Sequence, residues 1–204
     1  MERDRFKDLF RILRFDDCKT RAERKSREKM AAFREIFTIF VRHCQDNYNP
    51  CSHLTSDEQL VPFRGRCPFS VYMKSKPAKY GIKIWIMSDT ETAYAKNLQI
   101  YLGKRGDKPE VNQGQRVVLD LVSCLDKGYG ITVDNFFISL PLAKELLLRD
   151  FTLFGTLRKN KRDIPDILQP NKSKRSCHLL SSFKKTPLWS LLSLKKPSCY
   201  SVID

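Results

Sequence analysis

The order of the apolar segments between residues 53 and 165 constrains the fold more than any other feature of the sequence. The segments 53–63, 80–89 and 93–103 are rich in strand-forming residues and are typical of extended strands. Residues 112–125 have apolar side chains at helical spacing. The later segments are a strand at 130–137, a helix at 140–150 and a strand at 151–165 that runs into a basic loop. This order predicts an α/β fold with a mixed sheet and flanking helices.

Residues 1–50 form a separate helical segment in our interpretation. The side chains of Phe6, Leu9, Phe10 and Leu13 fall on one face of a helix, and a second apolar helical pattern runs over 30–44. The polar stretch 16–26 between them is interpreted as a polar connection within this helical segment. The helical segment is expected to end before the turn-forming residues that follow 47.

The last residues have a different character. Residues 171–204 are basic, rich in Ser and Leu, and lack a period of either 2 or 3.6 residues, so no fold is predicted for them. We therefore divide the chain into a helical segment at 1–50, an α/β domain at 51–170 and a basic tail at 171–204.

The charge of the chain points to a polyanionic partner. Its 38 Lys and Arg residues exceed 23 Asp and Glu residues, which gives a net charge of +15. A solvated basic surface is the plainer explanation. Seven cysteines without a CxxC spacing favour reduced thiols over a zinc site, and no apolar run is long enough for a membrane span. We expect a soluble intracellular protein that binds nucleic acid and does not associate with membranes.

Two aspartates lie at or near the ends of predicted strands. Asp57 belongs to the first strand, and Asp134 follows the apolar run of residues 130–133. Each carboxylate alone is more simply explained as a turn cap or an ion-pair partner. On neighbouring strands, the same two carboxylates could instead hold a divalent metal, and carboxylate ligands suit Mg²⁺.

Three blocks of sequence carry a resemblance to a known family. LTSDEQLVPFRGRCPFSVYMKSKPAKYGIKIW, TVDNFFISLPLAKELL and TLFGTLRKNKRDIP resemble successive signature blocks of the piggyBac transposases, and the similarity covers residues 4–170. The resemblance implies an RNase H-like fold and a nuclear enzyme that cuts and joins DNA at TTAA sites with Mg²⁺ and three aspartates. Asp57 matches the first aspartate and Asp134 matches the second.

The third aspartate of the family has no counterpart here. It lies well beyond the GTLRKNKR block, and neither Asp163 nor Asp166 stands in its place. With an incomplete RNase H-like domain and an incomplete triad, the chain is expected to be a transposase-derived fragment that does not cleave DNA. The alternatives are a domesticated DNA-binding or regulatory protein and an active transposase that another chain completes. DNA is the expected partner, with a homodimer or a related transposase as a further one.

The resemblance also implies which basic residues contact DNA. In the family the basic block lies along the DNA backbone, and such phosphate contacts are sensitive to salt and blind to sequence. Lys74 and Lys79 add positive charge beside the first block. The candidate DNA-binding residues are Arg64, Arg66, Lys76, Arg158, Lys159, Lys161 and Arg162.

Two places depart from the family pattern. Ser56 replaces a β-branched residue and is expected to bring a hydroxyl toward the core, which weakens the strand unless the hydroxyl is hydrogen-bonded. In the tail, synonymous codons can be chosen for residues 184–197 such that a shifted reading frame encodes QKDTTLVSFVPKKT. This peptide resembles the sequence that follows in the family. We predict a change of reading frame near residues 172–180, and the nucleotide sequence tests it. An alternative exon or a misassigned gene boundary would produce the same protein.

Overall fold

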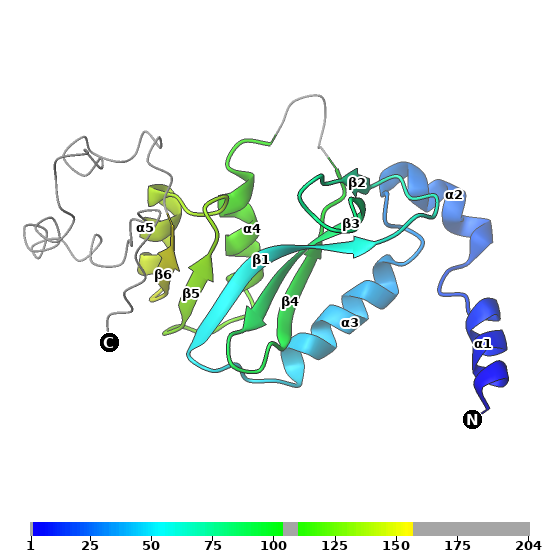
Figure 1. Cartoon of the computed structure of the whole chain (residues 1–204), viewed down its shortest axis with the longest axis horizontal. Coiled ribbons are helices and arrows are strands. Elements are labelled where there is room, and N and C mark those ends of the chain that lie inside the picture. The colour runs from blue at the N-terminus through cyan, green and yellow to red at the C-terminus, as the bar shows by residue number, and fades with distance from the viewer. Residues whose placement is uncertain (1, 104–109, 157–204) are drawn as a thin grey trace, which may run out of the picture.

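The computed structural model describes residues 2–103 and 110–156, which form a mixed sheet with helices on both faces (Figure 1). The helices are α1 (Arg3–Ile12), α2 (Cys18–Arg27), α3 (Arg34–Asp46), α4 (Gln113–Val122) and α5 (Leu140–Leu148). The strands are β1 (His53–Pro62), β2 (Ser70–Tyr72), β3 (Tyr80–Asp89), β4 (Ala95–Ile100), β5 (Gly130–Val133) and β6 (Thr152–Gly155). The predicted α/β class is thereby confirmed.

The six strands form one sheet in the order β2-β3-β1-β5-β6. β4 also pairs with β3, beside the half of β3 that β2 leaves free. The pairs made by β3 are antiparallel, whereas β5 lies parallel to both β1 and β6. The parallel pairs are possible because α4 and α5 provide the connections into β5 and β6. Short β2 was not among the predicted strands.

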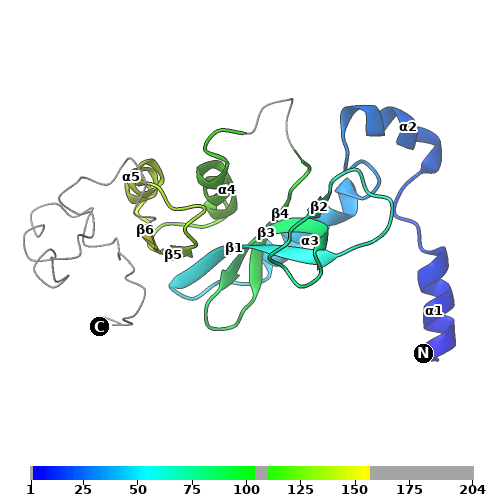
Figure 2. The ribbon, with the colours of Figure 1, turned by 45° about the horizontal axis from the view of Figure 1, so that its top comes forward.

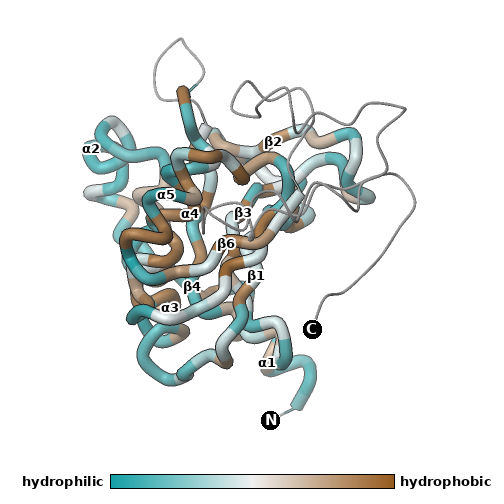
Figure 3. The backbone as a smooth tube through the Cα atoms, turned by 90° about the vertical axis from the view of Figure 1, so that its left-hand side faces the viewer, coloured by the Kyte–Doolittle hydropathy of each residue, from teal (hydrophilic) through white to brown (hydrophobic). Residues whose placement is uncertain are grey.

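The main core lies between the sheet and the helices α4 and α5. Alternate residues of the strands point to this side, so that Leu54, Met87 and Ile131 are fully buried beneath the two helices. Figure 3 shows apolar residues along α4 and α5, where they cover the strands. The tandem Val117 and Val118 on α4 are both buried, as their helical spacing predicted.

A smaller cluster lies on the opposite face of the sheet, where α3 packs over β4. Met30, Phe69 and Ile100 are buried there, and Phe33 and Phe37 pack against them. Met30 and Phe33 precede α3, which begins at Arg34 and so later than the apolar pattern suggested. α3 leaves the part of this face near β5 and β6 uncovered (Figure 1).

The polar stretch 16–26, interpreted as a connection between two helices, contains most of a helix of its own, α2. α2 begins after Asp17, whose side chain accepts a hydrogen bond from the amide of Lys19. Asp16 forms ion pairs with Arg24 and, to a lesser effect, with Arg21, and these hold the pKa of its carboxyl below the usual range. N-capping and ion pairs therefore stabilise a helix that has no apolar stripe to reveal it.

α1 stands apart from the sheet in both ribbon views (Figures 1 and 2). Its apolar face is exposed, with 55% of Phe6, 46% of Leu9 and 70% of Phe10 accessible to solvent. No helix within residues 2–103 and 110–156 has the length and apolarity needed to cross a bilayer.

Asp89 joins the end of β3 to the segment before β1. Its buried carboxylate accepts hydrogen bonds from the amide of Cys51 at 2.6 Å and the hydroxyl of Tyr48 at 3.0 Å. It also accepts from the amides of Glu91 and Thr92 in the turn toward β4. The hydrogen bond from Cys51, followed by those from the turn, lowers the pKa of Asp89 to about 2.

Candidate carboxylate and DNA-binding site

The parallel pairing of β1 and β5 brings the two candidate aspartates together. The register joins Leu54 to Ile131 and ends with Ser56 opposite Val133. One step further along the same register lie Asp57 and Asp134. Because neighbouring strands are about 4.8 Å apart, the two residues are adjacent at the carboxyl end of β5. Sequence alone suggested neighbouring strands but could not give this register.

Both aspartates lie on the side of the sheet that faces away from α4 and α5. The residues that precede them, Ser56 and Val133, point into the core, so the alternation of a strand turns the aspartates outward. Asp57 and Asp134 are exposed to solvent. This is the side that α3 leaves uncovered near β5.

The two carboxylates have few partners among the described residues. Asp57 accepts one hydrogen bond, from the amide of Glu58 at 2.7 Å. The carboxylate of Asp134 accepts none, while its backbone carbonyl accepts from Phe137 and Ile138 and closes a turn. Neither carboxylate forms a salt bridge within the described ranges. Two adjacent anions without a cation are a favourable place for a divalent metal.

The described residues supply a partial fit to such a metal. Carboxylate oxygens are the ligands that Mg²⁺ prefers, and both side chains are accessible. No group of three metal-ligating side chains is present in residues 2–103 and 110–156. Glu58 is next to Asp57, but its side chain points to the opposite face and its carboxylate lies 3.8 Å from the Lys76 ammonium.

The helix α4 fixes the position of the turn that begins at Asp134. Gly114, in the first turn of α4, is buried against this turn. A Cβ atom at Gly114 would lie 2.9 Å from the carbonyl oxygen of Phe136 and 3.0 Å from the Cα of Phe137. The helix can approach this closely because glycine has no side chain. Phe137 is itself fully buried, so the turn is anchored from both sides.

The candidate DNA-binding residues differ in their surroundings. Arg64 and Arg66 are exposed in the loop between β1 and β2. Lys76 is half-buried and donates to the backbone carbonyl of Glu58 at 3.1 Å, so it is tied to the strand that bears Asp57. Lys74 and Lys79 are exposed in the same region. Arg158, Lys159, Lys161 and Arg162 lie outside the described residues.

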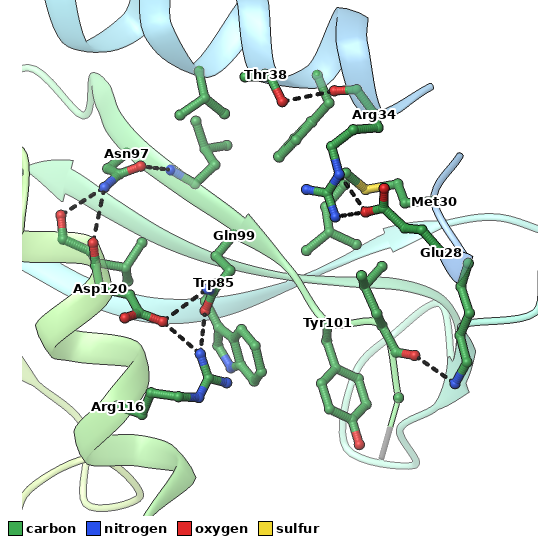
Figure 4. A pocket seen from close by; sticks show the side chains of 18 of the residues that line it. Glu28, Met30, Arg34, Thr38, Trp85, Asn97, Gln99, Tyr101, Arg116 and Asp120 are labelled. Carbon is green, nitrogen blue, oxygen red and sulfur yellow. Dashed lines mark hydrogen bonds and ion pairs between the residues drawn. The ribbon is translucent and has the colours of Figure 1, made fainter. Parts of the chain in front are cut away.

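A groove of about 700 Å³ lies elsewhere, between α3 and α4 along β4 (Figure 4). Its charged side chains are largely paired with one another. Arg116 forms ion pairs with Glu110 and with Asp120, and Arg34 forms one with Glu28. Lys29 and Arg42 also line the groove, so its lining has more basic than acidic side chains.

Comparison with known proteins agrees with this geometry. The family model described as transposase IS4 matches residues 1–202. The chain belongs to the piggyBac-type transposase family. The match extends to residue 202 and thus includes the basic tail.

Two human relatives and one solved structure are similar to this transposase-family chain. PiggyBac transposable element-derived protein 3 and the chimeric ERCC6-PGBD3 protein, both from Homo sapiens, are each 27% identical over 169 residues, or 80% of the chain. The cryo-EM structure of a piggyBac transposase synaptic complex with hairpin DNA has a TM-score of 0.77 and 43% identity over 86% of the chain. The fold is therefore RNase H-like, as the resemblance implied.

The transposase-family chain is much shorter than these relatives. It spans 28% of the first human protein, 16% of the second and 37% of the chain in the solved structure. Sequence reasoning singled out the two aspartates of the site, but it did not select Gly114, which the packing of α4 against the turn requires. Gly114 lies outside the three blocks of sequence that carry the family resemblance.

Proposed function

We propose that this chain is a transposase-derived protein that binds DNA, holds a divalent cation between Asp57 and Asp134, and does not cleave DNA by itself. The observation that carries the proposal is the register of β1 and β5, which makes the two aspartates adjacent and directs them outward. The name of the solved relative, a synaptic complex with hairpin DNA, supports DNA as the partner. The net charge of +15 supports the same partner.

The absence of cleavage follows from the number of metal ligands. A divalent cation on two carboxylates would neutralise part of the charge of a DNA phosphate, which is what such an ion supplies when bound. Mg²⁺ bound to two protein oxygens must complete its shell with water, so binding is weak. The described residues offer no third carboxylate at this place. We therefore propose a site that contributes to DNA binding and lacks the ligand set needed for strand transfer.

The recognised DNA and the place of action are part of the same proposal. We propose that the protein acts in the nucleus and retains some preference for DNA that contains TTAA, as the family resemblance implies. Phosphate contacts from the exposed Arg64 and Arg66 would supply affinity without specificity. Preference for TTAA therefore has to come from other contacts, and it can be lost while DNA binding persists.

The test uses the purified chain with a labelled duplex that carries TTAA. We expect binding that weakens steeply with salt, and no nicking of the duplex with Mg²⁺ or Mn²⁺. The doubly substituted variant Arg64→Ala with Arg66→Ala should bind more weakly, whereas Lys127→Ala, at the opposite end of β5, should not. Nicking that disappears in Asp57→Asn and in Asp134→Asn would contradict the proposed lack of cleavage and would favour an active transposase. Absence of DNA binding at low salt would contradict the proposal as a whole.

A second function, association with another transposase chain, is favoured by α1. This helix exposes Phe6, Leu9 and Phe10 on one face without contact to the sheet. An exposed apolar stripe of this kind usually marks a surface that another protein covers. We propose that a second copy of this chain or a related transposase binds there.

A further inference from the structure

Three exposed aromatic side chains follow one another across β2, β3 and the end of β1. Tyr72 of β2 pairs directly with Tyr80 of β3, and their ring centres are 4.8 Å apart. The pairing of β1 with β3 ends with Pro62 opposite Gly81, so Phe63 lies beside Tyr80 one step further along the register. Tyr72, Tyr80 and Phe63, here called the aromatic row, are 56%, 54% and 40% exposed. A contiguous exposed apolar surface usually has a binding role.

The backbone beside the aromatic row is fixed by hydrogen bonds. The turn between β2 and β3 is closed by the amide of Met73, which donates to the carbonyl of Lys79 at 2.7 Å. The side chain of Lys76, in the same turn, donates to the carbonyl of Glu58 at 3.1 Å and thereby ties the turn to β1. The strands that carry the rings are therefore held together before any ligand arrives.

The aromatic row lies on the same face of the sheet as the carboxylate site. Asp57 pairs with Ile86 of β3, and directly paired residues point to the same face. Tyr80 is six residues before Ile86 along β3, an even number, so its side chain points to that face as well. Six residues of strand span about 20 Å. A ligand that lies along β1 and β3 can therefore reach both places.

The surroundings of the aromatic row are strongly basic. Residues 59–82 contain five basic residues and no acidic one. The five are Arg64, Arg66, Lys74, Lys76 and Lys79. Lys76 is engaged by Glu58, whereas the other four are exposed and form no salt bridge within residues 2–103 and 110–156. Apolar rings among unneutralised cations fit a polyanion that also carries flat apolar groups, and nucleic acid combines the two.

We infer that Tyr72, Tyr80 and Phe63 form a surface on which unpaired bases of DNA stack. The inference rests on the proposed DNA-binding function and adds the class of DNA, namely a duplex that continues into a single strand. Bases inside a duplex are stacked on each other, so only an unpaired base can reach the rings. The distance of about 20 Å to Asp57 corresponds to about six nucleotides at 3.4 Å each.

A cross-strand pair of tyrosines also stabilises a short hairpin without any ligand. That contribution concerns the contact between the two rings and leaves their exposed faces without a task. The two roles differ in what DNA does: only a stacking surface distinguishes a single-stranded overhang from a blunt end.

The test measures binding of the full chain to a blunt duplex and to the same duplex with an overhang of about ten nucleotides. We expect the overhang to raise the affinity on the order of 5- to 150-fold, the range for one stacked base. Tyr80→Leu should lose most of this gain and keep the salt slope, because it removes a ring and no charge. Tyr80→Phe should retain the gain. Phe40→Leu, at a phenylalanine that is also 54% exposed but lies on α3, is the matched control and should change nothing.

A second measurement does not depend on the stability of a variant. In the overhang, 2-aminopurine replaces one base at a time, and its fluorescence falls when it stacks on an aromatic ring. We expect such quenching with the unmodified chain and with Tyr80→Phe, and not with Tyr80→Leu, while thermal unfolding of each variant checks the fold.

The outcomes separate this inference from the proposed function. If the unmodified chain binds both DNAs equally and quenches no position, the stacking surface is refuted and DNA binding stands. If Tyr80→Leu unfolds at a lower temperature but quenches as the unmodified chain does, the tyrosine pair only stabilises the hairpin and the inference is refuted. If the unmodified chain binds neither DNA, both proposals are refuted.

Discussion

Ser56 of β1 lies opposite Val133 of β5 at the last step of their parallel register. This pair is buried, and each member is followed by an aspartate that points to the opposite side of the sheet. The adjacency of the aspartates is thus a property of the backbone pairing and not of an interaction between their side chains. Changes at the two carboxylates should leave the fold intact and alter what the site binds.

Substitution of either aspartate should abolish most divalent-metal binding. In a titration with Mn²⁺, used in place of Mg²⁺, we expect Asp57→Asn and Asp134→Asn each to lower the affinity on the order of tenfold or more, since each removes one charged ligand of the pair. The Mn²⁺ affinity of the double variant should be only slightly lower than that of the single variants, because both aspartates belong to one site. Asp126→Asn, an exposed aspartate before β5, serves as the control. Unchanged affinity in Asp134→Asn would exclude the end of β5 from the site.

Gly114→Ala should disturb the turn that begins at Asp134. The added methyl group would meet the backbone of Phe136 and Phe137 at 3.0 Å or less, and backbone atoms cannot move aside cheaply. We expect a loss of about 1–3 kcal/mol in the free energy of unfolding and weaker binding of Mn²⁺. Gln115→Ala, one residue further along α4, should change either quantity little. Equal effects of the two substitutions would show that α4 does not hold the turn.

Ser56→Ala should stabilise the protein. The hydroxyl of Ser56 is buried and has no hydrogen-bond partner among the described residues, so its removal relieves a desolvation cost of about 1 kcal/mol. Ser139→Ala is a matched control that should destabilise the protein. Ser139 caps α5, and its hydroxyl oxygen accepts a hydrogen bond from the amide of Leu142 at 3.3 Å. Urea unfolding of both variants measures the difference. A destabilised Ser56→Ala would mean that the hydroxyl has a partner in solution.

Asp89 should make the protein sensitive to acid. Its pKa is lowered to about 2 in the folded state, so its stabilising contribution is complete above the unfolded value near 4 and is lost as the pH falls toward 2. Asp89→Asn should reduce the free energy of unfolding at neutral pH by about 1–3 kcal/mol, since an amide nitrogen cannot accept the bonds that the carboxylate accepts. Below pH 2 the free energies of unfolding of the variant and the unmodified protein should become similar. A constant difference from pH 7 to pH 2 would contradict this role.

Phe10→Glu should weaken self-association through α1. Phe10 is 70% exposed on the apolar face of the helix, so a charge there disfavours a covered interface without affecting the sheet. We expect the sedimentation coefficient of the variant to be lower than that of the unmodified chain at high protein concentration. Leu148→Glu, at a leucine that is 83% exposed at the end of α5, should have no such effect. If the unmodified chain is monomeric alone and with a related transposase, α1 is not an association surface.

Helices and strands with a clear period of apolar residues could be predicted from the sequence, and those without such a period could not. The alternation around Ser56 correctly placed its hydroxyl in the core, because a strand has a fixed period of two. α2 was missed because capping and ion pairs around Asp16 and Asp17 stabilise it in place of an apolar face. β2, with three residues, is too short to show a period.

Features that depend on distant parts of the chain could not be predicted. The identities of Asp57 and Asp134 came from local motifs, but their adjacency needs the register between β1 and β5. The position of Lys83 depends on a ring contributed by the turn after β5. Such contacts are set by the packing of α4 against that turn, and one sequence without its structure carries no local signal for them.

The parallel pairing of β1 with β5 also determines the order in which the strands can pair during synthesis. β1 can pair with β3 early, since both strands are synthesised close together and form an antiparallel ladder. The strand that precedes Asp134 leaves the ribosome much later, after β4 and α4, and long-range parallel pairing is slow to form. A nascent chain therefore carries Asp57 on an open strand edge for much of its synthesis. A bound cation can stabilise the sheet once β5 has paired with β1, but it cannot guide the first steps of folding.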